Sequence, residues 1–171
     1  MTAVPPKRRS PRTANRGATA RFGDFIEDFR ASWRAPAHRE LRKRFPDIFS
    51  LLCDEPTLVS GDVTIKAYGI EYPRGWHRLV VRLAASITNL TPPDARPTCV
   101  QVKEKFGELR FYLADEAPDE VLATINTAKE ESQRTCQECG RPGQVRDIGS
   151  WLSTLCGRHF LRKRLSRLKP R

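Results

Sequence analysis

Two short pairs of metal-ligating residue types near the C-terminus constrain the fold more than any other feature of this 171-residue chain. Cys136 and Cys139 form a C-x-x-C pair. Gly140 follows it, and a residue without a side chain lets the backbone turn so that both sulfurs face one point. Seventeen residues after Cys139, Cys156 and His159 repeat the two-residue gap. Three thiolates and one imidazole at this spacing predict a tetrahedral metal site.

Four protein ligands fill a tetrahedral shell, so this pattern is typical of one structural Zn²⁺ ion with no open position for catalysis. The alternative is that these are unrelated buried thiols and a stray histidine. Cys53 and Cys99 fit no such spacing, and we expect them to be small core residues unless one replaces a misassigned ligand. We expect Trp151 and Leu155 to cover the site.

The net charge of +11 is concentrated at the two ends of the chain. Residues 1–21 hold six basic and no acidic side chains, and residues 158–171 hold seven basic and none acidic. The segment between them has 18 basic and 20 acidic residues. Unbalanced like charges repel one another, so nucleic acid or an acidic protein surface is the expected partner. The alternative is that the charged ends only solubilise the chain.

The apolar pattern predicts an α+β fold in which helices pack on a small antiparallel sheet, followed by a zinc-ribbon-like module and a basic helix. We expect a disordered basic tail over residues 1–20, an α+β body over 21–134 and the zinc module over 135–171. Within these parts, the predicted helices cover 22–36, 37–44, 76–91, 118–134 and the segment after His159. A strand is predicted at 63–67, a β-hairpin over 98–113 and a second small hairpin between the ligand pairs.

Segments of this chain resemble a family of uncharacterised bacterial and bacteriophage proteins. Residues 102–112 (VKEKFGELRFY) precede residues 136–143 (CQECGRPG) and 151–159 (WLSTLCGRH), as a KEKFG-LRFY segment precedes a Cys/His cluster in that family. The resemblance covers roughly residues 69–160, including Gly75 and Trp76. Glu108 stands where a second glycine is expected, so the hairpin turn is expected to differ in type. The resemblance implies the hairpin and the metal module, and a regulatory, phage or defence role, but no established activity.

Our leading interpretation is a non-enzymatic, zinc-containing protein that binds DNA or RNA. After His159, Phe160, Leu161, Leu165 and Leu168 form an apolar stripe that leaves basic side chains on the remaining surface. The predicted nucleic-acid contacts are Arg8, Arg9, Arg12, Arg158, Arg162, Lys163, Arg164, Arg167 and Lys169. The alternatives are an inhibitor or adaptor that binds an acidic protein, and a helix whose charges are merely solvated.

A third interpretation is a metal-dependent nuclease. Asp94 followed by Gln101 and Lys103 superficially resembles the acid and Q-x-K elements of such enzymes. Mg²⁺ requires hard oxygen ligands, however, and only Glu71 or Glu104 is at hand to supplement Asp94. We therefore expect no enzyme.

No stretch approaches the ~18 apolar residues that a membrane span requires. The first residues run straight into Pro5 and Pro6 without a signal peptide's apolar core. We expect a cytoplasmic protein without a membrane partner, and in a reducing cytoplasm cysteines favour metal over disulfides.

Overall fold

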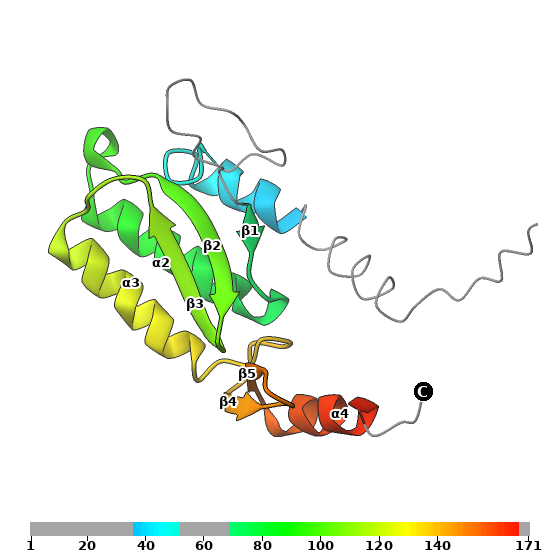
Figure 1. Cartoon of the computed structure of the whole chain (residues 1–171). Helices are drawn as coiled ribbons and strands as arrows, with labels where there is room; N and C mark the ends of the chain where they lie inside the picture. The colour runs from blue at the N-terminus through cyan, green and yellow to red at the C-terminus, as the bar shows by residue number, and fades with distance from the viewer. Residues whose placement is uncertain (1–35, 52–68, 168–171) are drawn as a thin grey trace, which may run out of the picture.

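The computed structural model of the chain describes residues 36–51 and 69–167 (Figure 1). Several predictions concern residues outside these ranges: the tail over 1–20, the helix after residue 22, the strand at 63–67, Cys53, Leu168, and the basic residues Arg8, Arg9, Arg12 and Lys169. The predicted α+β class is confirmed, because helices accompany a three-stranded and a two-stranded sheet.

The larger sheet has the strand order β1-β2-β3. Strands β2 (Cys99–Lys105) and β3 (Glu108–Leu113) form the predicted antiparallel hairpin, in which Val102 pairs with Phe111. Strand β1 (Ile70–Glu71) runs parallel to β2, with Ile70 opposite Val102. The sequence did not predict β1, because two residues are too short to show the alternation that identifies a strand.

The two-residue turn of the β2–β3 hairpin contains one glycine, Gly107. Lys105 pairs with Glu108, so the loop consists of Phe106 and Gly107, whose φ angles of 56° and 82° are both left-handed. Two left-handed central residues are characteristic of a type I′ turn, which follows the twist of the strands. Glu108 is therefore the first residue of β3. Its carboxylate pairs with Arg110 and accepts a 2.6 Å hydrogen bond from Nε2 of Gln133, the residue that follows the C-terminal end of the neighbouring helix.

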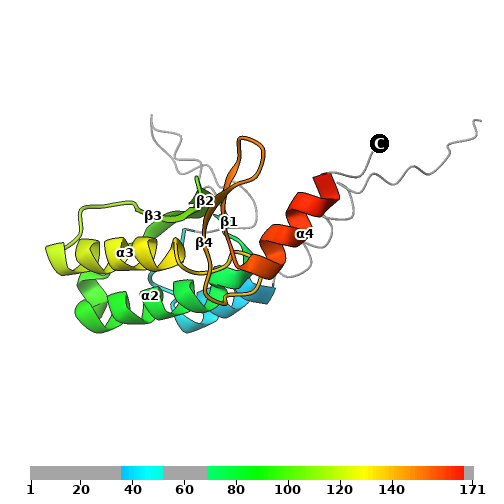
Figure 2. The same ribbon diagram turned by 90° about the horizontal axis from the view of Figure 1, so that it is seen from below.

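Two long helices lie on one side of the β2–β3 hairpin (Figures 1 and 2). Helix α2 (His77–Leu90) follows the short 3-10 helix η1 (Arg74–Trp76), and α3 (Asp119–Ser132) follows Pro118 with two acidic residues in its first turn. A second short 3-10 helix, η2 (Pro93–Ala95), follows the end of α2. Both predicted long helices are confirmed. So is the predicted short helix, which spans residues 36–44.

His77 links this short helix to α2. Its Nδ1 lies 2.7 Å from the Tyr72 hydroxyl, and its Nε2 lies 3.0 Å from Glu40 Oε2. Arg44 adds a 2.8 Å hydrogen bond to the other Glu40 oxygen. These two hydrogen bonds, with that of His77 first, lower the pKa of Glu40 because they stabilise its charged form.

The core of the body lies between the sheet and these helices. Every described helix and strand up to α3, apart from η2, contributes to one cluster of eighteen buried residues, in which Trp76, Tyr72 and Phe49 are the largest fully buried side chains. Phe49 meets Phe111 of β3 edge to face, with 6.1 Å between the ring centroids. Cys99 belongs to this cluster, as the sequence predicted.

The C-terminal segment forms a smaller unit beside the tip of the hairpin. Strands β4 (Gln144–Asp147) and β5 (Leu152–Leu155) are antiparallel, which confirms the predicted second hairpin, and α4 (Gly157–Arg167) follows. Among the described helices, none has both the length and the apolar character that a bilayer crossing requires.

Candidate metal centre

The four predicted ligand residues lie close together in the C-terminal unit. The Sγ atoms of Cys136, Cys139 and Cys156 and a ring nitrogen of His159 all lie within 4.8 Å of one another. His159 Nδ1 is 3.4 Å from Cys136 Sγ and 3.3 Å from Cys156 Sγ, and Cys139 Sγ is 3.9 Å from Cys156 Sγ. Bonds of about 2.3 Å to sulfur and about 2.0 Å to nitrogen give tetrahedron edges of roughly 3.5–3.8 Å. The cluster can therefore hold one metal ion.

The first ligand pair sits on a tight backbone turn. Gly140 has a left-handed φ of 72° and donates its N–H to the carbonyl of Cys136 at 2.9 Å. Cys136 in turn donates its N–H to the Arg141 carbonyl at 2.8 Å, which closes the turn. The predicted need for glycine at position 140 is confirmed, because a residue with a side chain disfavours this φ.

The second ligand pair joins a strand to a helix. Cys156 follows the last residue of β5, and His159 lies in the first turn of α4. The N–H of Phe160 donates to the Cys156 carbonyl at 2.9 Å, so the helix begins at the ligand itself. Because His159 lies in the first turn of α4, the position of its imidazole at the cluster determines how α4 is oriented.

Backbone N–H groups favour the thiolate form that metals bind. A hydrogen bond from the N–H of His159 lowers the pKa of the Cys156 thiol. Burial raises the pKa of the Cys136 thiol, and the N–H groups of Cys156, Glu138 and Cys139 oppose that rise. A cation at the centre would stabilise all three thiolates further.

Little apolar material supports the centre. Its buried cluster consists of Cys136, Ile148 and Leu155, with Cys156 and Phe160 packed against it. Leu155 covers the site as predicted, but the prediction for Trp151 is wrong, because this side chain is 64% exposed. Trp151 is the last residue before β5. Phe160, which lies on α4 next to His159, packs against the cluster instead.

The metal centre is attached to the body through backbone groups that sequence reasoning did not identify. Gly75 donates its N–H to the Gln137 carbonyl at 2.8 Å, and Trp76 Nε1 donates to the Thr135 carbonyl at 2.7 Å. A Cβ atom on Gly75 would lie 2.1 Å from the Cys136 carbonyl oxygen, so only glycine fits there. The Gly75-Trp76 pair was part of the family resemblance, which was the one available signal.

A second attachment joins the two hairpins. Thr154 of β5 donates its hydroxyl to the Gly107 carbonyl at 2.5 Å, and Thr154 is fully buried. The turn of the β2–β3 hairpin is therefore in direct contact with the β4–β5 hairpin, which lies far from it in sequence.

Two of the predicted nucleic-acid contacts on α4 also interact with the metal module. Lys163 Nζ lies 2.7 Å from Glu138 Oε1, and Arg167 donates to the Ile148 carbonyl. Arg158, Arg162 and Arg164 are exposed. Arg167 is exposed as well, so the described part of α4 carries four exposed arginines, one of which also bonds to the Ile148 carbonyl.

The predicted apolar stripe on α4 is also only partly correct. Phe160 packs on the module beneath the guanidinium of Arg146, which lies 4.4 Å from the ring centroid. Leu161 and Leu165 are 58% and 62% exposed. His159 points toward the cysteines, and Lys163 and Arg167, which share its side of the helix, each contact the module.

The residues of the nuclease interpretation do not form a metal site. Among residues 36–51 and 69–167, the Cys/His cluster is the only group of three or more His, Cys, Asp or Glu side chains that can hold an ion. Asp94 lies in η2, and the Glu104 carboxylate accepts the N–H of Gly107 at 2.7 Å. Gln101 and Lys103 do share one face of β2.

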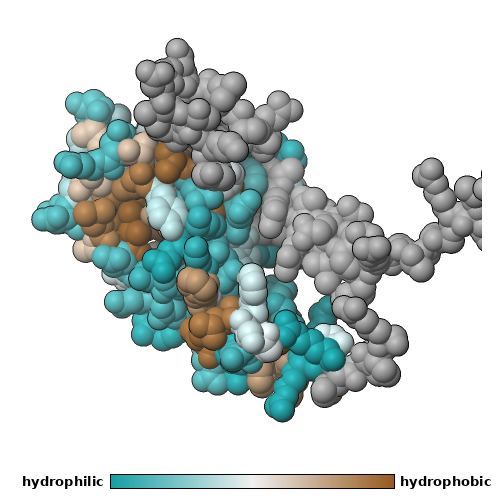
Figure 3. Space-filling view, in the orientation of Figure 1, coloured by the Kyte–Doolittle hydropathy of each residue, from teal (hydrophilic) through white to brown (hydrophobic). Residues whose placement is uncertain are grey.

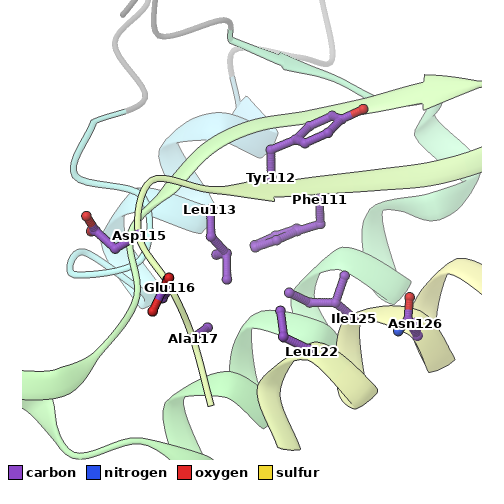
Figure 4. A pocket seen from close by; sticks show the side chains of 9 residues that line it. All are labelled: Phe111, Tyr112, Leu113, Asp115, Glu116, Ala117, Leu122, Ile125 and Asn126. Atoms are coloured by element: carbon purple, nitrogen blue, oxygen red, sulfur yellow. The ribbon is translucent and has the colours of Figure 1, made fainter. Parts of the chain in front are cut away.

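A shallow depression of about 580 Å³ lies between β3 and α3 (Figure 4). Phe111, Leu113, Leu122 and Ile125 give it an apolar floor, and Asp115 and Glu116 lie at one end. Its two carboxylates belong to no metal-binding group of the described residues. Within the part of the chain that the structure describes, the Cys/His cluster is therefore the candidate functional site. Comparison of the chain with models of protein families, with curated proteins and with solved structures found no match.

Proposed function

We propose that the chain binds one structural Zn²⁺ ion through Cys136, Cys139, Cys156 and His159, and that it binds nucleic acid through α4. Three thiolates and one imidazole are ligands that zinc prefers, whereas Mg²⁺ and Ca²⁺ prefer oxygen. Four protein ligands leave no position for water or substrate, which supports a structural ion over a catalytic one.

The observation that carries the nucleic-acid proposal is the position of α4 relative to the ligands. Arg158 lies between the two ligands of the second pair, and Arg162 follows one helical turn later. An ion held by these ligands would fix the helix and hold its exposed arginines in place. Guanidinium groups suit phosphates because they donate hydrogen bonds in a planar fork. The basic residues outside the described ranges, Arg8, Arg9, Arg12 and Lys169, would add further cations.

Elemental analysis of the purified chain tests the metal. We expect one zinc per chain, and a Cys139→Ser variant should bind it far more weakly because one of four ligands is lost. A Cys99→Ala variant is the matched control, since Cys99 is a buried thiol of the body core. No zinc in the wild-type protein, or equal zinc in the Cys139→Ser variant, would contradict the assignment.

Salt-dependent binding tests the nucleic-acid role. For duplex DNA, each phosphate contact contributes about −0.9 to the slope of log affinity against log salt. Changing Arg158, Arg162 and Arg164 to Gln should make the slope less steep by up to about 3. A control variant with Arg39, Lys43 and Arg78 changed to Gln loses the same charge from the exposed surface of the body. Equal effects of the two triple variants would refute a specific role of α4.

A second candidate function is supported by the exposed leucines. Leu161 and Leu165 lie one turn apart on α4, beside Arg158 and Arg162, and such a mixed apolar and cationic face also suits an acidic partner protein. A pull-down with and without nuclease separates the two functions. Capture of a protein that survives nuclease treatment but is lost on Leu161→Gln and Leu165→Gln would favour the protein partner.

A further inference from the structure

The β2–β3 hairpin has an outer face that is turned away from α2 and α3 (Figures 1 and 2). Lys103 and Arg110 are direct cross-strand partners, and Tyr112 follows Arg110 by two residues, so all three lie on this face. In the close view, Tyr112 points away from the side that Phe111 and Leu113 occupy (Figure 4). Tyr112 is 41% exposed, so the outer face presents an aromatic ring to solvent.

Phe106 presents a second ring at the turn of the same hairpin. It is 65% exposed and has a left-handed φ of 56°. The first central position of a type I′ turn favours Asn, Asp or Gly, and a bulky side chain at this φ is strained. Burial does not compensate for this strain, because the ring is mostly in solvent. A strained residue that contributes little to the core indicates a role in contact with another molecule.

A lysine ammonium group lies over each of the two exposed rings. Lys103 Nζ lies 5.1 Å from the centroid of the Tyr112 ring, and Lys105 Nζ lies 5.5 Å from that of Phe106. Arg110, by contrast, is paired with Glu108. A base can stack on an exposed ring while a neighbouring cation attracts its phosphate, which is how sheet surfaces bind single strands without sequence preference.

Among the described residues, Phe106, Tyr112 and Trp151 are the large aromatic side chains that are exposed. Trp151 belongs to the β4–β5 turn, and this hairpin contacts the tip of β2–β3 through Thr154 and Gly107. In Figure 3 the surface over both hairpins mixes hydrophilic with apolar side chains on the face turned to the viewer. The exposed rings therefore occur on two hairpins that are in contact.

We infer that Lys103, Lys105, Phe106 and Tyr112 form a binding site for single-stranded nucleic acid, which we term the aromatic face. The inference rests on the proposed nucleic-acid binding and names its substrate class. Duplexes keep their bases stacked on one another, so only a single strand can offer base faces to Phe106 and Tyr112. The hairpin arm from the turn to Tyr112 spans about 17 Å at ~3.4 Å per residue, which leaves room for several nucleotides.

The test compares duplex DNA, single-stranded DNA and single-stranded RNA of one length by fluorescence anisotropy, using the full chain. A Phe106→Asn, Tyr112→Thr variant removes both rings, while Asn suits the turn and Thr suits the strand. We expect a loss of at least ~10-fold in affinity for both single strands, because one stacked base contributes about 5- to 150-fold. Duplex affinity should change less than about twofold, since duplexes have no splayed base to stack.

Four further measurements make the result specific. Tyr112→Phe keeps a ring and should keep single-strand affinity, and Leu90→Ala removes an exposed apolar side chain from the end of α2 and should have no effect. Changing Lys103 and Lys105 to Gln should reduce the single-strand salt slope by about 1.4. The melting temperature of the Phe106→Asn, Tyr112→Thr variant should stay close to that of the wild type, which excludes unfolding as the cause of weaker binding.

The outcomes separate this inference from the proposed function. If the ring-free variant binds single strands as well as the wild type, the aromatic face is wrong, while the α4 triple variant still tests the helix. If ring loss weakens single-strand binding and the α4 variant changes nothing, the aromatic face stands and the role of α4 falls. If ring loss weakens duplex and single-strand binding equally, stacking is not the mechanism and the inference is overturned.

Discussion

The body and the metal module of this protein differ in the size of their apolar cores. Within residues 36–51 and 69–167, the apolar cluster of the body contains eighteen buried residues, whereas that of the module contains three, and one of these is the candidate ligand Cys136. Apolar burial scales with the area removed from water, so the body can be stable through its core while a unit as small as the module cannot. Under the proposed zinc binding, the ion and its four ligands would stabilise a unit whose apolar core is small.

Removing the metal should produce the largest difference between the two regions. A structural zinc ion contributes roughly 10–16 kcal/mol of apparent binding free energy in small zinc modules, and this becomes folding free energy. We expect a chelator, or Cys136→Ser, to abolish amide-exchange protection in β4, β5 and α4. Amides of β2 and β3 should stay protected. Protection that persists in β4 and β5 without metal would show that the module has an adequate core of its own.

Trp76→Ala should have the next largest effect, and it should act on the body. Trp76 is fully buried, and removal of a buried Trp side chain costs about 3–5 kcal/mol. Urea unfolding followed on the body amides measures this loss. Trp76→Phe keeps most of the apolar area but loses the hydrogen bond to the Thr135 carbonyl, so it should cost less in the body and still loosen the module. An equal cost for both variants would mean that the hydrogen bond, not the packing, dominates.

Gly75→Ala should disturb the contact between the two regions without altering either core. The added Cβ would lie 2.1 Å from the Cys136 carbonyl oxygen, so the first ligand pair must move away from η1. We expect a destabilisation of about 1–3 kcal/mol, typical of overpacking, with the metal still bound. Gly69→Ala is the matched control, because nothing lies within 4 Å of a Cβ there. Equal stability of the two variants would contradict the described docking of the first ligand pair on η1.

The smallest effect concerns the pH dependence of the body. Hydrogen bonds from His77 and Arg44 lower the pKa of Glu40 below its usual 4.5. Glu40 therefore stabilises the folded state above that pH, and this contribution is lost as the pH falls through the lowered value. Glu40→Gln should cost under about 1 kcal/mol near neutral pH, because the pair is largely exposed. In urea titrations the difference from wild type should shrink in acid, and a difference that grows there would contradict the direction of the shift.

Local patterns predicted most of the described elements. Helices α2 and α3 and the β2–β3 hairpin follow from their apolar periodicity and from Pro92, Pro118 and Gly107 at their ends. Strand β1 was not predicted, since Ile70 and Glu71 join the sheet only through pairing with β2. The ligand spacing predicted that Cys136, Cys139, Cys156 and His159 would meet, and their ligand atoms do lie together.

Two aspects of the site depended on packing. The sequence placed Trp151 over the metal centre, but Phe160 packs there, because His159 sets the rotation of α4 about its axis. The sequence also counted Lys163 and Arg167 among the outward cations, and in the structure both contact the module while Arg167 stays exposed. A helical repeat shows which residues share a face, but the anchoring contact decides which face is inward.

The sequence by itself determined the identity of the ligands, the ends of the main elements and the concentration of positive charge at the termini, because spacing, turn residues and charge are local properties. Only the tertiary structure decided that Gly75 and Gly107 touch the metal module and that Phe106 and Tyr112 remain exposed. These facts depend on contacts between segments far apart in the chain. Such contacts are selected by how volumes and hydrogen bonds fit together in space, which no local pattern encodes.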